Sequence, residues 1–498
     1  MNEDTSTTIE IPHASMQELK QRGELPATKE GLAIELAMRI GDMLASSGAS
    51  ANETVVMMRR VCQVYGLSRA QLDVNYNVIL ASYYPGEGSP PFTAIRNISP
   101  MVPNLSKVYA VNDLVNQIYG GLSISKATKR FDRIRKAPSA YPEWLAALAA
   151  GGISMSVQLF YTTSPKVLFL ALVTGFLVNR FVYLLGTRGL PTLFQQLFGG
   201  WLTVVFAAGF TWLNAHPKFD FVGYVSPTTI AVGCVFQLVV GARFVAGIQD
   251  AIDGFYVTAT ARILEVVMMT AGLVVGLVTG LAIVRRLGVD VYISSEPPTA
   301  GSVPVQFIAA TLTAVLWAVS NFANRRTIVV TAFVTLIGWG VYWVAQLWTS
   351  AVIADFAGPM VAALIATILV RRFFQIPGFG VINAMGIPFV PGLLLYLGLI
   401  QLVGSTSAAA DPSKGAATLG TAAVIALAIA AGASLGVFLG RPVSEKLILI
   451  PQTWHQRLKK TPPPLTPARG KLTHLTSPGP AVIPSNPTVI PPQEFYVN

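Results

Sequence analysis

The sequence predicts a mainly α-helical, polytopic membrane protein with about ten transmembrane helices and a small α+β domain at its amino terminus. Of its 498 residues, 52 % are hydrophobic and only 12 % are charged, and the mean hydropathy is +0.56. Soluble globular proteins carry roughly 25 % charged residues, so this composition excludes an ordinary soluble enzyme. The charges are also unevenly placed, because residues 142–440 hold 22 of them over 299 positions and the other 199 positions hold 37. The chain therefore combines a membrane-like middle with two water-soluble ends.

Cysteine content and net charge narrow the class further. Two cysteines, Cys62 and Cys234, exclude a disulfide framework and a four-cysteine metal site. The net charge of +11 fits either nucleic-acid binding or the basic loops on the cytoplasmic face of a membrane protein. The middle contributes 13 Lys and Arg against 9 Asp and Glu, and residues 441–498 contribute 7 against 2. Most of the excess belongs to membrane loops and the tail, which favours contact with an anionic lipid bilayer and not with nucleic acid.

The amino-terminal α+β domain is expected over residues 30–141, behind a disordered polar segment of residues 1–29. That segment lacks the apolar stretch of a secretory signal, so the domain is expected to stay in the cytoplasm. Apolar residues spaced by about 3.6 positions predict helices, and runs rich in Val, Ile and Tyr predict strands. The expected helices cover residues 28–47, 52–65, 106–119 and 123–136, and the expected strands cover residues 71–82 and 92–98.

Ten apolar stretches follow, each long enough to cross a hydrocarbon core of roughly 30 Å, which takes about 20 helical residues. They cover residues 142–161, 166–185, 195–213, 227–247, 263–284, 304–324, 327–347, 349–370, 386–403 and 416–439. We expect two transmembrane halves of five helices each, residues 142–284 and 304–440, joined by a loop over residues 285–303. The ninth stretch is expected to be broken or re-entrant, because Pro377, Pro388 and Pro391 crowd its entry.

Lys and Arg in the short loops predict the orientation of the helices. With the amino terminus inside, the inner loops hold 13 of these residues and the outer loops hold five, although the Arg285–Arg286 pair then lies outside. Both termini are therefore expected in the cytoplasm. Residues 441–498 are rich in proline and poor in large apolar residues, which predicts a disordered cytoplasmic tail.

Two groups of helices share landmarks in the same order, which indicates an internal repeat. Helices two to five contain VNRF, LFGGWLTVV and GARF, and helices six to nine contain SNFANRR, LIGWGVYWV and VRRF. Such symmetry is common in transporters, whose substrates bind between the repeats at the polar connections of broken helices. Apolar sequences also resemble one another through composition alone, and that explanation stays open.

The richest cluster of polar side chains lies at residues 249–265, between two apolar stretches. Ionisable groups at membrane depth cost several kcal/mol unless they are paired or hydrated, so they are candidates for substrate binding or proton coupling. Asp250 and Asp253 share one helix face at a spacing of three, and Arg262 and Glu265 do the same. The candidates are Asp250, Asp253, Thr258, Thr260, Arg262 and Glu265. A solvated cytoplasmic loop explains the stretch up to Arg262 equally well, whereas Glu265 is expected inside the bilayer.

A second candidate lies at residues 375–396, where glycine and proline interrupt the helix. The interruption exposes backbone groups that a membrane tolerates only against protein or water. We expect this stretch to form half of a substrate site through Asn383, Pro388 and Pro391. A long cytoplasmic loop ahead of a conventional helix is the alternative.

A third candidate lies between the second and third helices. Arg188, Gly189, Pro191 and Gln195 stand where the chain re-enters the membrane, which fits a gate as well as a structural turn. Asp355, near the outer end of the eighth helix, fits a carboxylate that relays protons. A side chain at a helix end can also extend to the lipid headgroups, and in that case it needs no functional role.

Enzyme chemistry has little support in the sequence. The four histidines are scattered through the tails and one outer loop, so neither a catalytic triad nor a metal site is indicated. The glycine-rich phosphate loop of ATPases is missing, so ATP is not expected to drive this protein. We expect no cofactor, no metal and no enzymatic activity.

Four motifs stand out along residues 30–440, namely RIGDMLASSGASANET, LGTRGLPTLFQQLFGG, QDAIDGFYVTATARILE and GIPFVPGLLLY. In this order and at these membrane depths, they resemble the threonine/serine exporter family of bacterial inner membranes, in its long actinobacterial form. That family joins a cytoplasmic amino-terminal domain to about ten transmembrane helices. The resemblance implies a multi-pass inner-membrane protein that exports L-threonine and L-serine by secondary active transport, driven by the proton motive force. It assigns no proven role to any residue.

A different class of function remains as an alternative. The chain would then be a membrane-anchored hydrolase or regulatory receptor whose amino-terminal domain acts through Asp42, Ser46 and Ser47. No base at a recognisable spacing supports a nucleophilic site there. The sequence also leaves open whether copies of the chain assemble into a homo-oligomer.

Overall fold

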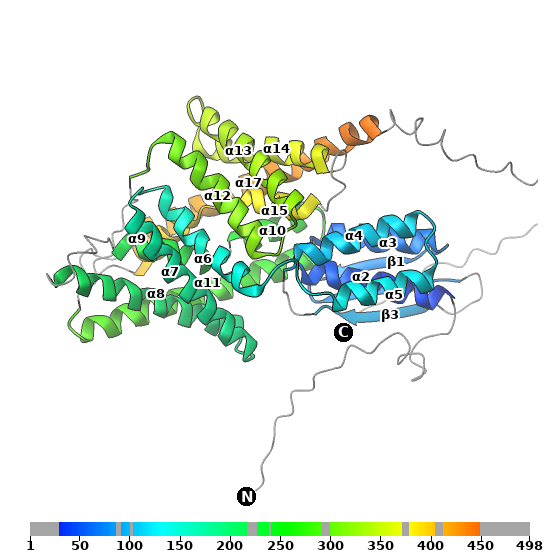
Figure 1. The fold of residues 1–498 in the computed structure, drawn as a ribbon, viewed down its shortest axis with the longest axis horizontal. Coiled ribbons are helices and arrows are strands. Elements are labelled where there is room, and N and C mark those ends of the chain that lie inside the picture. The colour runs from blue at the N-terminus through cyan, green and yellow to red at the C-terminus, as the bar shows by residue number, and fades with distance from the viewer. Residues whose placement is uncertain are drawn as a thin grey trace, which may run out of the picture. The chain divides into compact units, whose positions relative to one another are not determined.

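A computed structural model describes residues 29–85, 91–99, 103–216, 227–238, 241–289, 299–370, 378–403 and 412–448 (Figure 1). The terminal segments expected to be disordered, residues 1–29 and 441–498, fall largely outside these ranges, as does Pro377. Their borders differ slightly from expectation, because the first described helix begins at Lys29 and the last one continues to Ile448.

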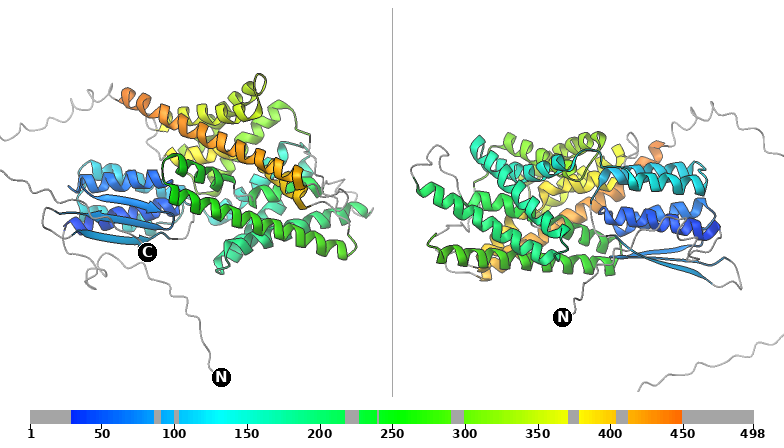
Figure 2. Two further views of the ribbon diagram at one scale, coloured as in Figure 1. Left: turned by 180° about the vertical axis from the view of Figure 1, so that it is seen from behind. Right: turned by 60° about the horizontal axis from the view of Figure 1, so that its bottom comes forward.

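The amino-terminal module (residues 29–136) combines four helices with a three-stranded antiparallel sheet of order β1-β2-β3. Its elements are α2 (Lys29–Ser46), α3 (Ala51–Val64), β1 (Gln71–Asn75), β2 (Val78–Tyr83), β3 (Phe92–Asn97), α4 (Leu105–Tyr119) and α5 (Ile124–Lys136). Leu72 pairs with Ala81 in the first ladder, and Leu80 pairs with Ile95 in the second. Alternate residues of β1 and β2 are buried, since the helices cover one face of the sheet (Figure 2).

The strand predicted over residues 71–82 is two strands, joined by a tight turn at Tyr76 and Asn77. Tyr76 has a φ of 47°, in the left-handed region that residues other than glycine seldom adopt. The prediction of one strand was wrong because the turn contains neither glycine nor proline, the usual markers of a hairpin.

Helix α2 is the best-buried element of the module, and its charged side chains have partners. Arg39 forms an ion pair with Asp132 of α5, and Glu35 forms one with Arg96 of β3. Charges are tolerated at such positions because each is paired. These pairs tie the first helix to the sheet and to the last helix of the module.

Within its described ranges, the membrane part (residues 143–448) consists of helices joined by turns and short connections. Its first half contains α6 (Glu143–Leu159), α7 (Pro165–Thr187), α8 (Thr192–Ala215), α9 (Pro227–Leu238), α10 (Gly241–Ile252) and α11 (Tyr256–Arg286). Its second half contains α12 (Val303–Ser320), α13 (Arg325–Gln346), α14 (Ala351–Leu369), α15 (Gly378–Gly386), the 3-10 turn η3 (Ile387–Phe389), α16 (Gly392–Val403) and α17 (Pro412–Ile448).

Eight helical segments among the described residues are long and apolar enough to cross a membrane, and the segment from α15 to α16 adds a ninth if it is one span. That segment bends by 48°, so the ninth predicted span is broken, as its prolines indicated. The one predicted span that is not among these nine is α6. Its 17 residues rise about 26 Å, slightly less than a hydrocarbon core of roughly 30 Å. The chain is a multi-pass membrane protein.

The two halves of the membrane part pack in the same pattern. Helix α6 contacts α7 as α12 contacts α13, and α8 lies along α11 as α14 lies along α17. The fourth span of the first half covers α9 and α10, and that of the second half is the bent segment from α15 to α16. The packing therefore matches α6–α11 with α12–α17. The sequence landmarks instead matched α7–α11 with α12–α16, so they were shifted by one helix. Those landmarks reflect composition and not the repeat itself.

Glycines let the two longest helices, α11 and α17, approach their neighbours closely. They recur every fourth residue, as Gly272, Gly276 and Gly280 against α8 and as Gly432, Gly436 and Gly440 against α14. A Cβ on Gly276 would lie 2.0 Å from the carbonyl oxygen of Leu197, and one on Gly436 would lie 2.2 Å from that of Met360. No side chain fits at such distances, and small residues at this spacing are a common basis of helix packing in membranes.

Candidate functional site

The predicted cluster at residues 249–265 forms the joint between α10 and α11. Helix α10 ends here because Gly254 adopts a φ of 88° and Phe255 donates its N–H to the carbonyl of Asp250, at 2.8 Å. This is a glycine-dependent helix C-cap. The chain then turns into α11, which brings Arg262 Nη1 to 2.6 Å from Asp250 Oδ2. The two residues form an ion pair across the joint.

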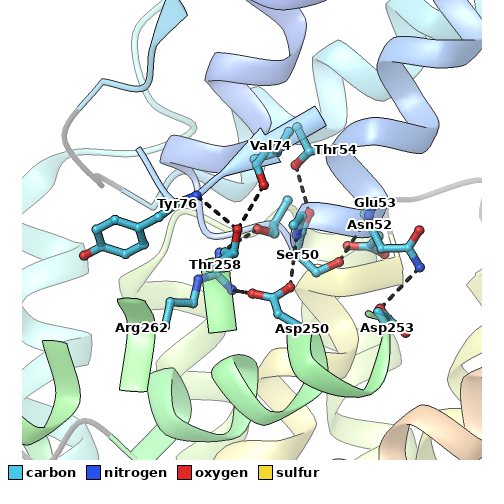
Figure 3. Close-up of polar contacts among 12 residues, drawn as sticks. Ser50, Asn52, Glu53, Thr54, Val74, Tyr76, Asp250, Asp253, Thr258 and Arg262 are labelled. Atoms are coloured by element: carbon cyan, nitrogen blue, oxygen red, sulfur yellow. Dashed lines mark hydrogen bonds and ion pairs between the residues drawn. The ribbon is translucent and has the colours of Figure 1, made fainter. Parts of the chain in front are cut away.

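The Asp250–Arg262 pair also contacts the amino-terminal module. The Asp250 side chain is fully buried, and its Oδ1 accepts the N–H of Ala51, the first residue of α3, at 3.1 Å (Figure 3). Arg262 Nη2 donates to the carbonyl of Ala49 at 3.3 Å. A carboxylate is favoured at the amino end of a helix, where the helix dipole is positive. The pair therefore holds the start of α3 against the joint.

Two further predicted residues contact the module at other points. Thr258 Oγ1 donates to the carbonyl of Val74 at 2.9 Å and accepts the N–H of Tyr76 at 3.0 Å (Figure 3). It thus satisfies backbone groups at the β1–β2 turn, where Tyr76 has its unusual conformation. Asp253 Oδ2 accepts a hydrogen bond from Asn52 Nδ2 at 3.2 Å. Four of the six residues predicted in this cluster therefore face the module.

A cavity of about 230 Å³, the module-side cavity, adjoins the joint. Its charged and amide lining comprises Arg243, Gln249, Arg262, Glu265, Asn321 and Asn383. The module contributes Ser47, Gly48, Pro103 and Leu105 to the wall, and the other lining residues are apolar residues or glycine of the membrane part. Arg243 and Glu265 form an ion pair within this lining. The structure thus brings Arg262 and Glu265 of the first predicted stretch together with Asn383 of the second. Guanidinium and carboxylate groups side by side can bind the two charged ends of a small zwitterion.

The remaining residues predicted in these stretches lie elsewhere. Thr260 is exposed, and its hydroxyl donates to the carbonyl of Tyr256 within α11, at 2.8 Å. Pro388 and Pro391 line a second cavity of about 280 Å³, which we call the far cavity. Val390, between these prolines, lines both cavities. The broken span therefore separates them.

The predicted gate is the exposed turn between α7 and α8. Arg188 caps the end of α7, Gly189 has a φ of 79°, and Pro191 directly precedes α8. Gln195 Nε2 donates to the carbonyl of Leu190 at 2.6 Å, so the hydrogen bonding of the turn is local. These residues line neither cavity.

The residues suggested for a hydrolytic module do not form a reactive set. Asp42 accepts a hydrogen bond from the N–H of Ser99 at 2.8 Å, and Ser46 donates to the carbonyl of Met43 at 3.3 Å. Ser47 lines the module-side cavity instead. Within the described ranges, no group of three or more His, Cys, Asp or Glu side chains is placed to hold a metal ion.

Arg243 lines the cavity but was not among the candidates predicted from the sequence, where it counted only among the basic residues of the inner loops. Its partner Glu265 lies 22 positions later, on the next helix, so no local spacing links the two. The scarcity of charge between residues 142 and 440 is the signal that could have identified this residue, because an arginine so placed needs a partner.

Comparison with known proteins agrees with the resemblance seen in the motifs. Residues 35–284 match a family profile described as "Putative threonine/serine exporter", and residues 306–439 match one described as "Threonine/Serine exporter, ThrE". A Mycobacterium tuberculosis protein named "Probable threonine/serine exporter" is 27 % identical over 427 residues, which cover 82 % of this chain and 77 % of that protein. A Corynebacterium glutamicum protein named "Threonine/serine exporter" is 28 % identical over 412 residues, which cover 82 % of each chain. No solved structure matches the chain. Since the first profile alone spans half of the sequence and the second covers most of the other membrane half, the chain belongs to the threonine/serine exporter family.

Proposed function

We propose that the chain is a secondary active transporter that exports L-threonine and L-serine across the inner membrane of a bacterium. The observation that carries the proposal is the module-side cavity, where Arg243, Arg262 and Glu265 meet inside a multi-pass membrane protein of this family. The names of the relatives supply the substrate class, because threonine and serine are small zwitterions. At about 230 Å³ the cavity is smaller than the pockets of roughly 300–1,000 Å³ that hold drug-sized ligands.

In this proposal the charged groups of the substrate replace an ion pair that already exists. Arg243 and Glu265 neutralise each other in the empty cavity. An amino acid that enters the cavity offers its carboxylate to the guanidinium of Arg243 and its ammonium group to Glu265. Neither state leaves a buried charge without a partner, which would be strongly unfavourable. The amide groups of Gln249 and Asn383 remain to bind the substrate hydroxyl.

We infer that the proton motive force supplies the energy, since the sequence lacks a phosphate-binding loop for ATP. The excess of Lys and Arg in the predicted inner loops supports an orientation with both termini in the cytoplasm. The module-side cavity then receives its substrate from the cytoplasm. Of the predicted carboxylates, Glu265 lines this cavity, whereas Asp250 and Asp253 contact the module.

Counterflow of labelled L-threonine into proteoliposomes that contain the purified full chain tests the function. We expect accumulation when the lumen is loaded with unlabelled threonine, competition by serine, and further accumulation under an imposed pH gradient. The variant Glu265→Gln should abolish counterflow, whereas the matched control Thr260→Val should keep it. The absence of counterflow in the wild-type chain would exclude the function, and accumulation that ignores the gradient would exclude proton coupling.

A further inference from the structure

The far cavity contains a carboxylate that the proposed binding site does not use. This cavity is lined by Tyr161, Trp339, Tyr342, Asp355 and the broken span over residues 388–394, and other lining residues are apolar or, like Thr313, hydrogen-bonded to their own helix. Asp355 lies in the first turn and a half of α14 and is 6 % exposed. It is thus a buried acidic group at the edge of a cavity.

Asp355 differs from Asp250 and Glu265, two other carboxylates of the membrane part, in its lack of a partner. Asp250 and Glu265 are each paired with an arginine. Among the described residues, the Asp355 side chain has neither an ion pair nor a hydrogen bond. Trp339, which is 7 % exposed and lines the same cavity, has an indole N–H without an acceptor in those ranges. An ionised carboxylate without a partner has an unfavourable free energy at this depth, so Asp355 is stabilised when it binds a cation or a proton.

The far cavity lies at the other end of α6 from the module. Helix α6 starts at Glu143, directly after the module, and its 17 residues rise about 26 Å before the chain reaches Tyr161 in the cavity wall. The module-side cavity, in contrast, has Ser47 of the module in its wall. The broken span lies between the two cavities, and Val390 contributes to both. A small movement of this span would open one cavity and close the other.

We propose that Asp355 takes up and releases the proton that is exchanged for substrate, and that the far cavity admits this proton from the membrane face opposite the module. This inference rests on the proposed function. A hydronium ion that enters the far cavity transfers its proton to a carboxylate oxygen of Asp355, which neutralises the side chain and leaves water behind. The O–H bond breaks again when the broken span has moved, and the proton leaves to water on the module side.

The surroundings of Asp355 suit a group that changes between a charged and a neutral form. The other titratable groups of the cavity wall are Tyr161, which follows α6, and Tyr342 of α13. The lining residues contributed by α9, α12, α16 and α17 carry no charge, and no lysine or arginine lies among those described. Since no fixed cation holds the carboxylate in its ionised form, a proton can neutralise it.

Asp355→Asn separates proton coupling from substrate movement in the reconstituted full chain. We expect threonine counterflow without a pH gradient to stay within about twofold of the wild-type rate, whereas gradient-driven accumulation falls to the level seen without a gradient. Asp355→Glu should recover part of the gradient-driven accumulation, and Glu143→Gln, an exposed carboxylate on α6, should behave as wild type. Gradient-driven accumulation that persists in Asp355→Asn would overturn the proposal. So would a folded Asp355→Asn protein that has lost counterflow as well, because Asp355 would then bind substrate.

A second measurement needs no variant and no transport. Dicyclohexylcarbodiimide modifies protonated carboxyl groups in apolar surroundings, and mass spectrometry locates the modified residue. We expect Asp355 of the wild-type protein to be labelled at low pH and to be protected as the pH rises. A wild-type protein without threonine counterflow but with this labelling would refute the proposed function and leave the proton site standing. An Asp355 that is never labelled would refute the proton site alone.

Discussion

Replacing Asp250 by asparagine should loosen the contact between the amino-terminal module and the joint of α10 and α11. Asparagine keeps an oxygen that can accept the N–H of Ala51, but it leaves Arg262 without its counter-ion. Arg262 is 8 % exposed, so it cannot regain water without a local movement. Removal of one partner from a buried ion pair costs about 3–5 kcal/mol, because the other charge stays buried.

Much of this cost should appear as weaker docking of α3. The two side chains of the pair bind Ala49 and Ala51, which flank the start of that helix. At about 1.4 kcal/mol per factor of ten, a loss of about 3 kcal/mol raises the equilibrium constant for opening about a hundredfold. Hydrogen–deuterium exchange of the full chain in detergent micelles measures this opening at residues 49–54. We expect the exchange there to accelerate by about two orders of magnitude.

The double variant Asp250→Asn/Arg262→Gln provides the decisive comparison. It removes the uncompensated charge, so its exchange should be slower than that of Asp250→Asn alone, with a coupling energy of about 0.5–3 kcal/mol. Thr260→Val, on an exposed face of α11, serves as the control and should exchange like the wild type. Exchange in Asp250→Asn that stays within about threefold of wild type would refute the reasoning. Strict additivity of the two single changes would refute it as well.

Two further predictions concern packing and chemistry away from this joint. Gly276→Ala should lower the midpoint of thermal unfolding, followed by tryptophan fluorescence in micelles, because its Cβ would lie 2.0 Å from the Leu197 carbonyl oxygen and overpacking costs about 1–3 kcal/mol. Gly209→Ala, whose Cβ would meet nothing within 4 Å, is the matched control, and equal midpoints would contradict the packing argument. Cys62 should resist maleimide at pH 8 until the protein unfolds, because burial raises the pKa of its thiol to about 12. Rapid labelling of this thiol in the folded protein would contradict its burial.

Helices were predictable here because their signals are local. The spacing of apolar residues placed a helix at residues 28–47, and the structure has α2 at Lys29–Ser46. The β1–β2 hairpin was missed because its turn at Tyr76 and Asn77 contains neither glycine nor proline. Its conformation is supported by Thr258, which lies 182 positions away in the chain and binds the N–H of Tyr76. No window of local sequence contains both partners.

The candidate site was predictable in its residue types and much less in its arrangement. Scarce charge drew attention to Arg262 and Glu265, and both line the module-side cavity. Spacing along a helix placed Asp250 and Asp253 on one helix face. In the structure α10 ends at Ile252 with a cap at Gly254, so Asp253 lies just beyond the helix. Asp250 instead meets Ala51, 199 positions earlier. Contacts between residues so far apart in the chain depend on how the module packs against the membrane part. The periodicity of apolar residues does not predict that packing.

The position of Arg262 links the module to the proposed transport site. One guanidinium group pairs with Asp250, binds the carbonyl of Ala49 and lines the cavity in which the substrate would bind. A substrate carboxylate bound at Arg243 lies in the same cavity as Arg262, and its attraction for this second guanidinium would weaken the hold of Arg262 on α3. By the reciprocity of linked equilibria, a tightly held α3 would then weaken substrate binding by the same factor. We therefore expect the amino-terminal module to be coupled to occupancy of the cavity through a side chain that both share. Such a coupling would give the amino-terminal module a role in the proposed transport.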